Sequence, residues 1–465
     1  MNYRSERDLL GEKQVPADAY YGVQTARAIE NFRITGQRIH PGLVKALAQV
    51  KKAAAQANQQ LGYLTPEVAG AIAAAADEII EGKLRDQFVV DPIQGGAGTS
   101  ANMNANEVIA NRAIELLGGQ KGDYAIVSPN DHVNFAQSTN DAFPTAIHLA
   151  VLTAVSNLLE AAHRLEDALM AKATEFDHVV KMGRTHLQDA VPVRLGQEFH
   201  AYATAVRRGQ ARIKDAAQDL TEINLGATAV GTGLNADPRY AALVAEILST
   251  VSGRQLTQAA DMIDATQSCD PYVAVSGQVK ALAVALSKIA NDLRLMASGP
   301  RTGLKEINLP EMQPGSSIMP GKVNPVMAEV LNQACFYVMG CDLTVMMAAE
   351  AGQLELNVME PVLVHSLLSA IDVLTNAVGL FTERLVRGLV ANEERCAELV
   401  EQSVGLVTAL NPVIGYKYAS AVAREAYQTG RSVREIVLER GLLTEAELDS
   451  ILSPMALTEP GIAHR

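Results

Sequence analysis

Aromatic residues are scarce in this chain of 465 residues. They make up 4% of the sequence, and Trp is absent. A core with few aromatics must be built from Ala, Leu, Val, Ile and Met. Ala, Leu and Met are strong helix formers, whereas strands favour aromatic and β-branched residues. The scarcity therefore predicts a largely helical protein, and the 48% hydrophobic content excludes wholesale disorder.

Positive charge is also in deficit. The chain has 39 Lys and Arg against 52 Asp and Glu, a net charge of −13. Proteins that bind nucleic acid normally carry a basic face, so this balance argues against a nucleic-acid partner. It is compatible with an anionic small molecule, because such a site needs only a few local cations. The length suggests about two to four domains.

Cysteines are few, and targeting signals and membrane-type runs are absent. The four cysteines form neither a CxxC pair nor a metal-type spacing. No apolar segment follows the charged residues 3–8, and no run of about 20 uncharged apolar residues occurs. We therefore expect free thiols, a cytoplasmic protein and no membrane span.

Motifs for nucleotides and metals are missing as well. The segment Gly231–Ala236 fits the loose dinucleotide pattern GxGxx[GA], but it lacks the strand–helix context that the pattern needs. The sequence contains no GxxxxGK[ST] loop, no HExxH and no EF-hand loop. It thus predicts neither a bound cofactor nor a dedicated metal site.

Long apolar repeats are present instead. Apolar residues recur at alternating spacings of three and four from Val151 to Leu169 and from Val275 to Met296. Such seams are typical of long helices packed side by side. The second segment also carries Ala at many other positions, which indicates burial on several sides. We expect a helix bundle shared between subunits, with a large monomeric bundle as the alternative.

These patterns divide the chain into three parts. Residues 1–140 mix short helices with loops, and residues 141–393 hold the long helices. Residues 394–465 form a small helical domain that includes a break at Asn411–Pro412. The predicted fold class is all-α.

Four short polar segments interrupt the helical pattern. They are rich in Ser, Thr and Asn, and three contain Gly, so they offer hydrogen bonds and let the backbone approach a ligand closely. Together they favour one shared site for a small oxyanion over four unrelated loops. His186 stands out among nine histidines because it lies beside a hydroxyl and near a cation. The segments are Gln94–Ser100, Gln137–Asp141, Gly183–Gln188 and Gly315–Pro325.

The fourth segment, with the sequence GSSIMPGKVNP, resembles the signature of the aspartase/fumarase superfamily along its whole length. The other three coincide with the remaining active-site regions of that family, and the resemblance covers nearly the whole chain. It implies a three-domain, mainly α fold. It also implies a central long-helix bundle shared in a homotetramer, with each active site built from three subunits.

Within the superfamily, several positions favour the aspartase branch over class II fumarase, which is the alternative. They carry residues that differ from those common in fumarases: Ser128, Thr139, Leu187, Asn224–Thr228 and Glu360. Gly321 points the other way, because fumarases share it. The resemblance implies reversible elimination of ammonia from L-aspartate to give fumarate and ammonium. Elimination from substituted aspartates is a further alternative. A different class of function, a non-catalytic structural or binding protein, is another.

The resemblance also implies catalytic roles. Ser316 is the expected general base on a mobile lid loop, and Lys322 would help to stabilise its alkoxide. His186 is the expected partner of Glu329, which would orient the imidazole and favour its charged form.

Preorganised donors must hold the intermediate, because loss of the Cβ proton leaves two negative charges on one carboxyl group. Hydroxyl groups are suited to donate to the reacting carboxyl group, and cationic or amide groups are suited to hold the second carboxylate of the substrate. An amide oxygen is suited to accept from the ammonium group. The candidate donors to the reacting carboxyl are Thr99, Ser138, Thr139 and Ser317. Lys322 and Asn324, helped by Thr185 and His186, would hold the other carboxylate, and Asn140 would bind the ammonium group.

Overall fold

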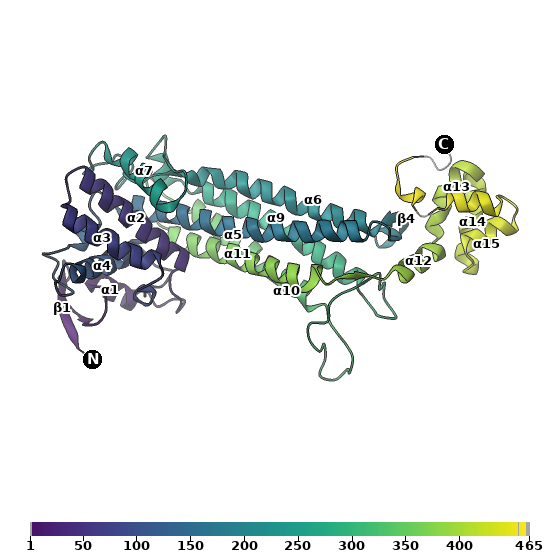
Figure 1. The fold of residues 1–465 in the computed structure, drawn as a ribbon, viewed down its shortest axis with the longest axis horizontal. Helices are drawn as coiled ribbons and strands as arrows, with labels where there is room; N and C mark the ends of the chain where they lie inside the picture. The colour runs from purple at the N-terminus through teal and green to yellow at the C-terminus, as the bar shows by residue number, and fades with distance from the viewer. Residues whose placement is uncertain (1, 454, 462–465) are drawn as a thin grey trace. The chain divides into compact units, whose positions relative to one another are not determined.

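The structure, a computed structural model, describes residues 2–453 and 455–461. Helices dominate it, and the strands in the described residues form only two-stranded pairs (Figure 1). The predicted all-α class is confirmed. The pairs are β1 (Tyr3–Asp8) with β2 (Gly11–Pro16), β3 (Val180–Thr185) with β4 (Gln188–Arg194), β5 (Glu222–Ile223) with β6 (Thr257–Gln258), and β7 (Ile307–Asn308) with β8 (Val390–Ala391).

The chain forms two compact units. Unit 1 comprises residues 1–159, 211–281 and 336–374, and unit 2 comprises residues 160–210, 282–335 and 375–465. The unit boundaries fall inside long helices, so they differ from the predicted divisions after residues 140 and 393. The three-part division stays a prediction.

Short and medium helices pack together in unit 1. Helices α2 and α3 both begin with a proline after a capping side chain, since His40 accepts from the Gly42 N–H and Thr65 from the Val68 N–H. Buried alanines such as Ala54 on α2 and Ala75 on α3 let these helices approach closely. The helices are α1 (Val23–Asn31), α2 (Pro41–Gln60), α3 (Pro66–Ile80), α4 (Thr99–Leu116), α7 (Tyr240–Ser252) and α8 (Asp264–Gln267).

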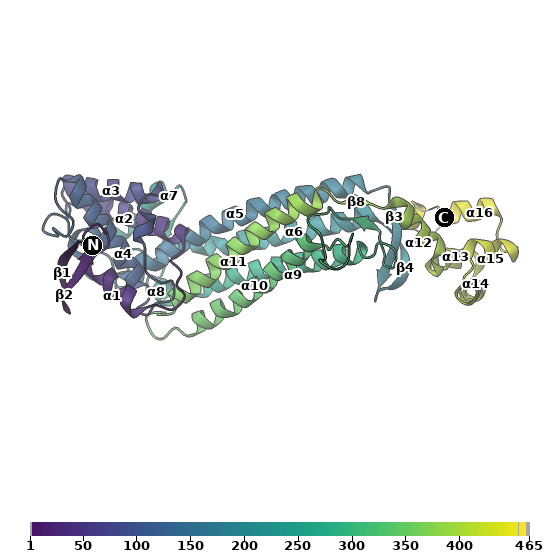
Figure 2. The same cartoon turned by 90° about the horizontal axis from the view of Figure 1, so that it is seen from below.

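The described chain has five long helices, and two of them, α5 and α9, carry the predicted apolar seams. Val151, Leu158, Leu165 and Leu169 in one seam, and Leu286 in the other, are at most 1% exposed, so both seams are confirmed as buried faces. In unit 2, parts of the long helices lie side by side and are tied by polar side chains (Figure 2). The helices are α5 (Thr139–Glu175), α6 (Leu195–Ala216), α9 (Asp270–Met296), α10 (Val326–Glu350) and α11 (Glu360–Phe381).

Small helices close the chain around a separate apolar core. The predicted break at Asn411–Pro412 is wrong, because α13 continues through both residues to Ile414. Proline removes only one helical hydrogen bond there, and the chain turns at Gly415, where φ is +82°. The helices are α12 (Glu393–Gln402), α13 (Val407–Ile414), α14 (Tyr416–Thr429), α15 (Val433–Glu439) and α16 (Glu445–Ile451). All four cysteines are free, as predicted, and all four are buried.

Four helical segments are long and apolar enough, by length and composition alone, to cross a membrane. The share of the most apolar window that is buried within the chain ranges from 72% for α5 to 33% for α10. The expectation of no membrane span therefore stays a prediction. The low burial of α10 leaves an apolar face exposed on this chain. The segments are Thr139–Glu175, Asp270–Met296, Val326–Glu350 and Glu360–Val386.

Glu360, the first residue of α11, has a buried carboxyl group. The residue is 2% exposed, and its Oε2 has no hydrogen-bond partner among the residues that the structure describes. Burial raises the pKa of Glu360 to about 8. The folded chain thus keeps this group protonated at neutral pH.

The pH dependence of stability tests this assignment through Glu360→Gln. Between about pH 4.5 and 8 the folded carboxyl holds a proton that the unfolded one has lost. Its contribution to stability is therefore complete below pH 4.5 and is lost as the pH rises through 8. Glutamine does not titrate. In this window the free energy of unfolding of the variant therefore rises relative to that of the parent by at most about 1.4 kcal/mol per pH unit. Melting temperatures of both proteins from pH 5 to 9 measure the gain, and parallel curves would contradict the raised pKa.

Candidate active site

The first polar segment is a loop of left-handed backbone in unit 1. Gly96, Ala97 and Gly98 have φ values of +92°, +55° and +89°, and the loop leads directly into α4. The Gln94 side chain accepts a hydrogen bond from the Ala101 N–H at 2.9 Å. Thr99 is the exposed first residue of α4, and its hydroxyl donates to the Gly96 carbonyl at 2.7 Å. A ligand that takes a hydrogen bond from this hydroxyl would have to replace that contact.

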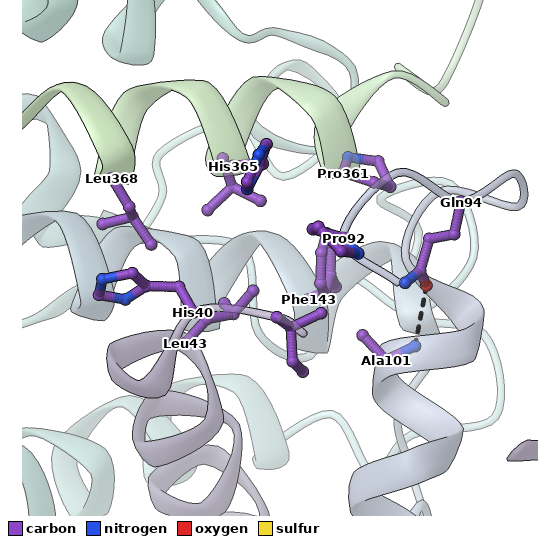
Figure 3. Close-up of a pocket in the computed structure, with 11 residues that line it drawn as sticks. His40, Leu43, Pro92, Gln94, Ala101, Phe143, Pro361, His365 and Leu368 are labelled. Carbon is purple, nitrogen blue, oxygen red and sulfur yellow. Dashed lines mark hydrogen bonds between the residues drawn. The ribbon is translucent and has the colours of Figure 1, made fainter. Parts of the chain in front are cut away.

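Tight packing holds this loop against the start of α5. A Cβ atom on Gly98 would lie 2.4 Å from the ring of Phe143. Figure 3 shows Gln94, Phe143 and Pro361 around a neighbouring pocket of about 10 Å³. That volume is at the limit for one water molecule. The pocket is therefore too small to be a substrate site, and the side chains that line it pack behind the loop.

The second polar segment forms the N-terminus of α5. The Ser138 hydroxyl accepts from the Asn140 N–H at 3.2 Å, and Asp141 Oδ1 accepts from the Ser138 N–H at 2.9 Å. Asp141 Oδ2 accepts from the N–H groups of Gly226 and Thr228 at 2.9 and 3.0 Å. Burial raises the pKa of Asp141 to about 6, against the pull of these three backbone bonds. This buried carboxyl joins the start of α5 to residues 224–228.

The same junction sets the orientation of Asn140. Its Nδ2 donates to the Ala229 carbonyl at 2.7 Å, and its backbone carbonyl accepts from Asn224 Nδ2 at 3.0 Å. The donor end of the amide is therefore occupied, and within the described residues its Oδ1 has no protein partner. Such an oxygen is suited to a ligand cation.

A buried lysine lies beneath this segment. Lys51 is 0% exposed and donates to Asn134 Oδ1 at 3.0 Å and to Gln137 Oε1 at 2.8 Å. Burial lowers the pKa of Lys51 to about 7, and the charge of Asp141 opposes this shift. Lys51 and Asp141 together anchor the second segment, and sequence reasoning gave neither a role.

Asparagines of α4 complete the anchor. Asn102 and Asn106 both donate to Asn134 Oδ1 at 3.1 Å, and Asn102 also donates to the Thr139 hydroxyl at 3.2 Å. Asparagine is unusual inside a buried helix because its amide must find partners. The alternation of Asn102, Asn104 and Asn106 in the sequence was therefore an available signal for this network.

The third polar segment is a hairpin tip in unit 2. Thr185 pairs with Gln188, so His186 and Leu187 form a two-residue turn with φ values of +54° and +60°. Such turns normally contain Asn or Gly, and bulky residues there cost on the order of 1 kcal/mol each. Both residues are exposed. A strained and exposed turn of this kind favours a functional role for His186.

The fourth polar segment, in unit 2, folds back on itself. The Gly315 N–H donates to the Lys322 carbonyl at 2.7 Å, and Asn324 Nδ2 donates to the Gly315 carbonyl at 2.9 Å. The half-buried Ser316 Oγ accepts from the N–H groups of Ile318 and Met319 at 3.2 and 3.0 Å. These donors stabilise negative charge on the oxygen.

The predicted site residues fall into two groups in the described chain. Glu329, on α10, lies 3.9 Å from Arg294, and no bond between Glu329 and His186 is found among the described residues. The expected pairing of these two residues stays a prediction. Unit 1 holds Thr99, Ser138, Thr139 and Asn140, whereas unit 2 holds Thr185, His186, Ser316, Ser317, Lys322, Asn324 and Glu329.

Comparisons with known proteins point to one family. A lyase family model matches residues 11–340, and a fumarase C C-terminus model matches residues 406–459. The chain is 60% identical to an aspartate ammonia-lyase from Bacillus sp over 462 residues, which cover 99% of both chains.

Solved structures agree. A cobalt-bound fumarate lyase:delta crystallin from Brucella melitensis is 51% identical with a TM-score of 0.97, covering 99% of this chain and 100% of the other. A class II fumarase from Schistosoma mansoni is 36% identical with a TM-score of 0.95, covering 100% of both. Within the described residues of this chain, no group of three or more His, Cys, Asp or Glu side chains could hold a metal ion such as cobalt.

Gly98→Ala tests the packing of the first segment. The substitution combines a left-handed backbone with a clash against Phe143, so we expect the free energy of unfolding to fall by about 2–4 kcal/mol. Gly62→Ala is the matched control, because Gly62 has a φ of +85° and nothing within 4 Å of an added Cβ. It should cost only about 1 kcal/mol. Urea unfolding of both variants gives the values, and equal losses would show that the Gly98 contact does not hold the loop.

Proposed function

This chain belongs to the lyase family whose model matches most of its length, and from that premise we propose that it converts L-aspartate reversibly into fumarate and ammonium. The observation that carries the proposal is the 60% identity to an aspartate ammonia-lyase over 99% of both chains. The identity to the class II fumarase is 36%. The reaction is an elimination at a carbon–nitrogen bond.

Stabilisation of the reacting carboxylate is the main task. Removal of the Cβ proton places two negative charges on one carboxyl group, so donors must already point at it. The hydroxyls of Thr99, Ser138, Thr139 and Ser317 supply such donors. The bonds of Asp141 and Asn102 fix the backbone and hydroxyl of the second segment in advance.

Other groups hold the rest of the substrate. Lys322 and Asn324 bind the second carboxylate, with help from Thr185 and His186. Asn140 Oδ1 accepts from the ammonium group, which is supported by the fixed orientation of that amide. The amine is already protonated and leaves as ammonia, which then takes up a proton to become ammonium, so the step needs no strong general acid.

Ser316 is the base in this proposal. Its Oγ takes the Cβ proton, and the electron pair moves into the carboxyl group and then into the new C=C bond as the C–N bond breaks. A serine alkoxide needs stabilisation. The two N–H groups of Ile318 and Met319 on Ser316 Oγ, together with Lys322 on the same loop, support that role.

The exposed face of α10 supports a homotetramer. Phe336, Leu343 and Met347 are 60%, 54% and 61% exposed, and their spacing with Gly340 places them on one face of the helix. An exposed apolar stripe with this spacing is suited to pack against the helices of other copies. We also propose that the protein is cytoplasmic and that it has neither a nucleic-acid partner nor a membrane span.

An assay with paired substrates tests the reaction. L-Aspartate should give fumarate, seen as ultraviolet absorbance, and L-malate should not. In the reverse direction, fumarate should give aspartate only when ammonium is present. Malate formed from fumarate without ammonium would replace the proposal with a fumarase.

A further inference from the structure

A buried carboxylate in unit 2 lies outside the groups assigned above. Glu306 is 0% exposed. Its Oε1 accepts from Arg184 Nη1 at 2.6 Å, and its Oε2 lies 3.3 Å from Lys181 Nζ. Both cations belong to β3, the strand that leads to Thr185 and His186. One carboxylate thus contacts two cationic side chains of the strand that leads into the hairpin tip.

The backbone of Glu306 is fixed on both sides. Its N–H donates to the Met296 carbonyl at 2.9 Å, and its own carbonyl accepts from the Asn392 N–H at 2.8 Å. The next residues form β7, which pairs with β8. In the described chain β7 is the last helix or strand before the loop that carries Ser316. Glu306 therefore lies just before the point at which regular secondary structure ends and the Ser316 loop begins.

The hairpin needs such an anchor. The pairing of β3 and β4 shifts its register between Met182 and Arg184, and a Cβ atom on Gly183 would lie 2.6 Å from the Val191 carbonyl. A bulge of this kind sets the direction of the residues that follow it. The tip beyond it is strained at both His186 and Leu187. Strain persists only where the surrounding structure enforces it.

The surrounding charges favour an anchor over a ligand site. A cavity of about 280 Å³ beside Glu306 is lined by three cationic and three anionic side chains, so no charge is left over for an ionic ligand. Each anion already has a partner, since Glu198 lies 3.1 Å from Lys181 and Asp292 accepts from the Tyr202 hydroxyl. The cations are Lys181, Arg184 and Lys288, and the anions are Glu198, Asp292 and Glu306.

We propose that Glu306 is a positioning residue that couples the Thr185–His186 hairpin tip to the base of the Ser316 loop. Through Arg184 and Lys181 it fixes the direction of the tip, and through its backbone it fixes the start of the loop. The two segments then share one anchor, and a shift of either one moves the other. The turnover test of this idea rests on the proposed function, but the exchange test below does not.

Glu306→Asp isolates the positioning role. It keeps the buried negative charge, so the two cations stay neutralised and the chain folds, but it withdraws the carboxylate by one methylene. Displacements of about 1 Å cost up to 10²-fold in rate. We expect kcat/KM for L-aspartate to fall by about 10- to 100-fold per folded tetramer.

Glu198→Asp is the matched control. It shortens the other carboxylate that pairs with Lys181, but Glu198 belongs to α6, so its backbone is not part of the chain segment that leads into the Ser316 loop. Its kcat/KM should stay within about twofold of the parent, since only one of the two anchored segments touches it. Parent-like turnover in Glu306→Asp, or an equal loss in Glu198→Asp, would overturn the proposal.

Amide hydrogen exchange gives a readout that does not depend on the reaction. In Glu306→Asp, residues 184–188 and residues 311–324 should both exchange faster than in the parent, whereas β1 and β2 should not change. Faster exchange in only one of these two segments, or everywhere, would overturn the coupling. If the parent showed no turnover of aspartate, this result would still decide the role of Glu306.

Discussion

The buried carboxyl of Asp141 is the constraint on which the polar residues of unit 1 depend. It accepts three backbone N–H groups, one from the start of α5 and two from residues 226 and 228. Irregular backbone in water would sample many conformations, and ordering it during a reaction would cost free energy. Asp141 removes that freedom in advance. Glu306 does the same in unit 2, where its partners are side-chain cations of β3.

These anchors place ionisable groups where water is excluded. Burial raises the pKa of Asp141 to about 6 and of Glu360 to about 8, and lowers that of Lys51 to about 7. At pH 7 Glu360 is therefore mostly protonated and Lys51 is partly neutral, because a buried charge is costly. Asp141, with a pKa of about 6, is mostly ionised, and its carboxylate is held by three backbone N–H groups. The Ala-rich helices around them offset this cost through close packing. The buried ionisable groups thus order the site at a cost in free energy, and the packing of the same core stabilises the fold.

The sequence predicted the local features and missed the long-range ones. The seams from Val151 and Val275 and the four polar segments follow from spacing and residue type alone, and the helices confirm the seams. The anchors could not be predicted in this way. Arg184 and Glu306 are 122 positions apart, and Lys51 and Gln137 are 86 apart, so no local pattern joins them. The break placed at Asn411–Pro412 failed because one lost hydrogen bond does not end a helix whose last turn is still bonded.

Mixing two inactive variants tests most directly whether a complete site draws the polar groups of unit 1 and unit 2 from different copies. Ser138→Ala removes a donor in unit 1, Ser316→Ala removes the base in unit 2, and each protein alone should be inactive. Unfolded together in equal amounts and refolded, they should regain about one quarter of the parent activity, because random assembly of the proposed tetramer combines two intact groups in that share of sites. Mixed tetramers that form but stay inactive would contradict a site shared between copies.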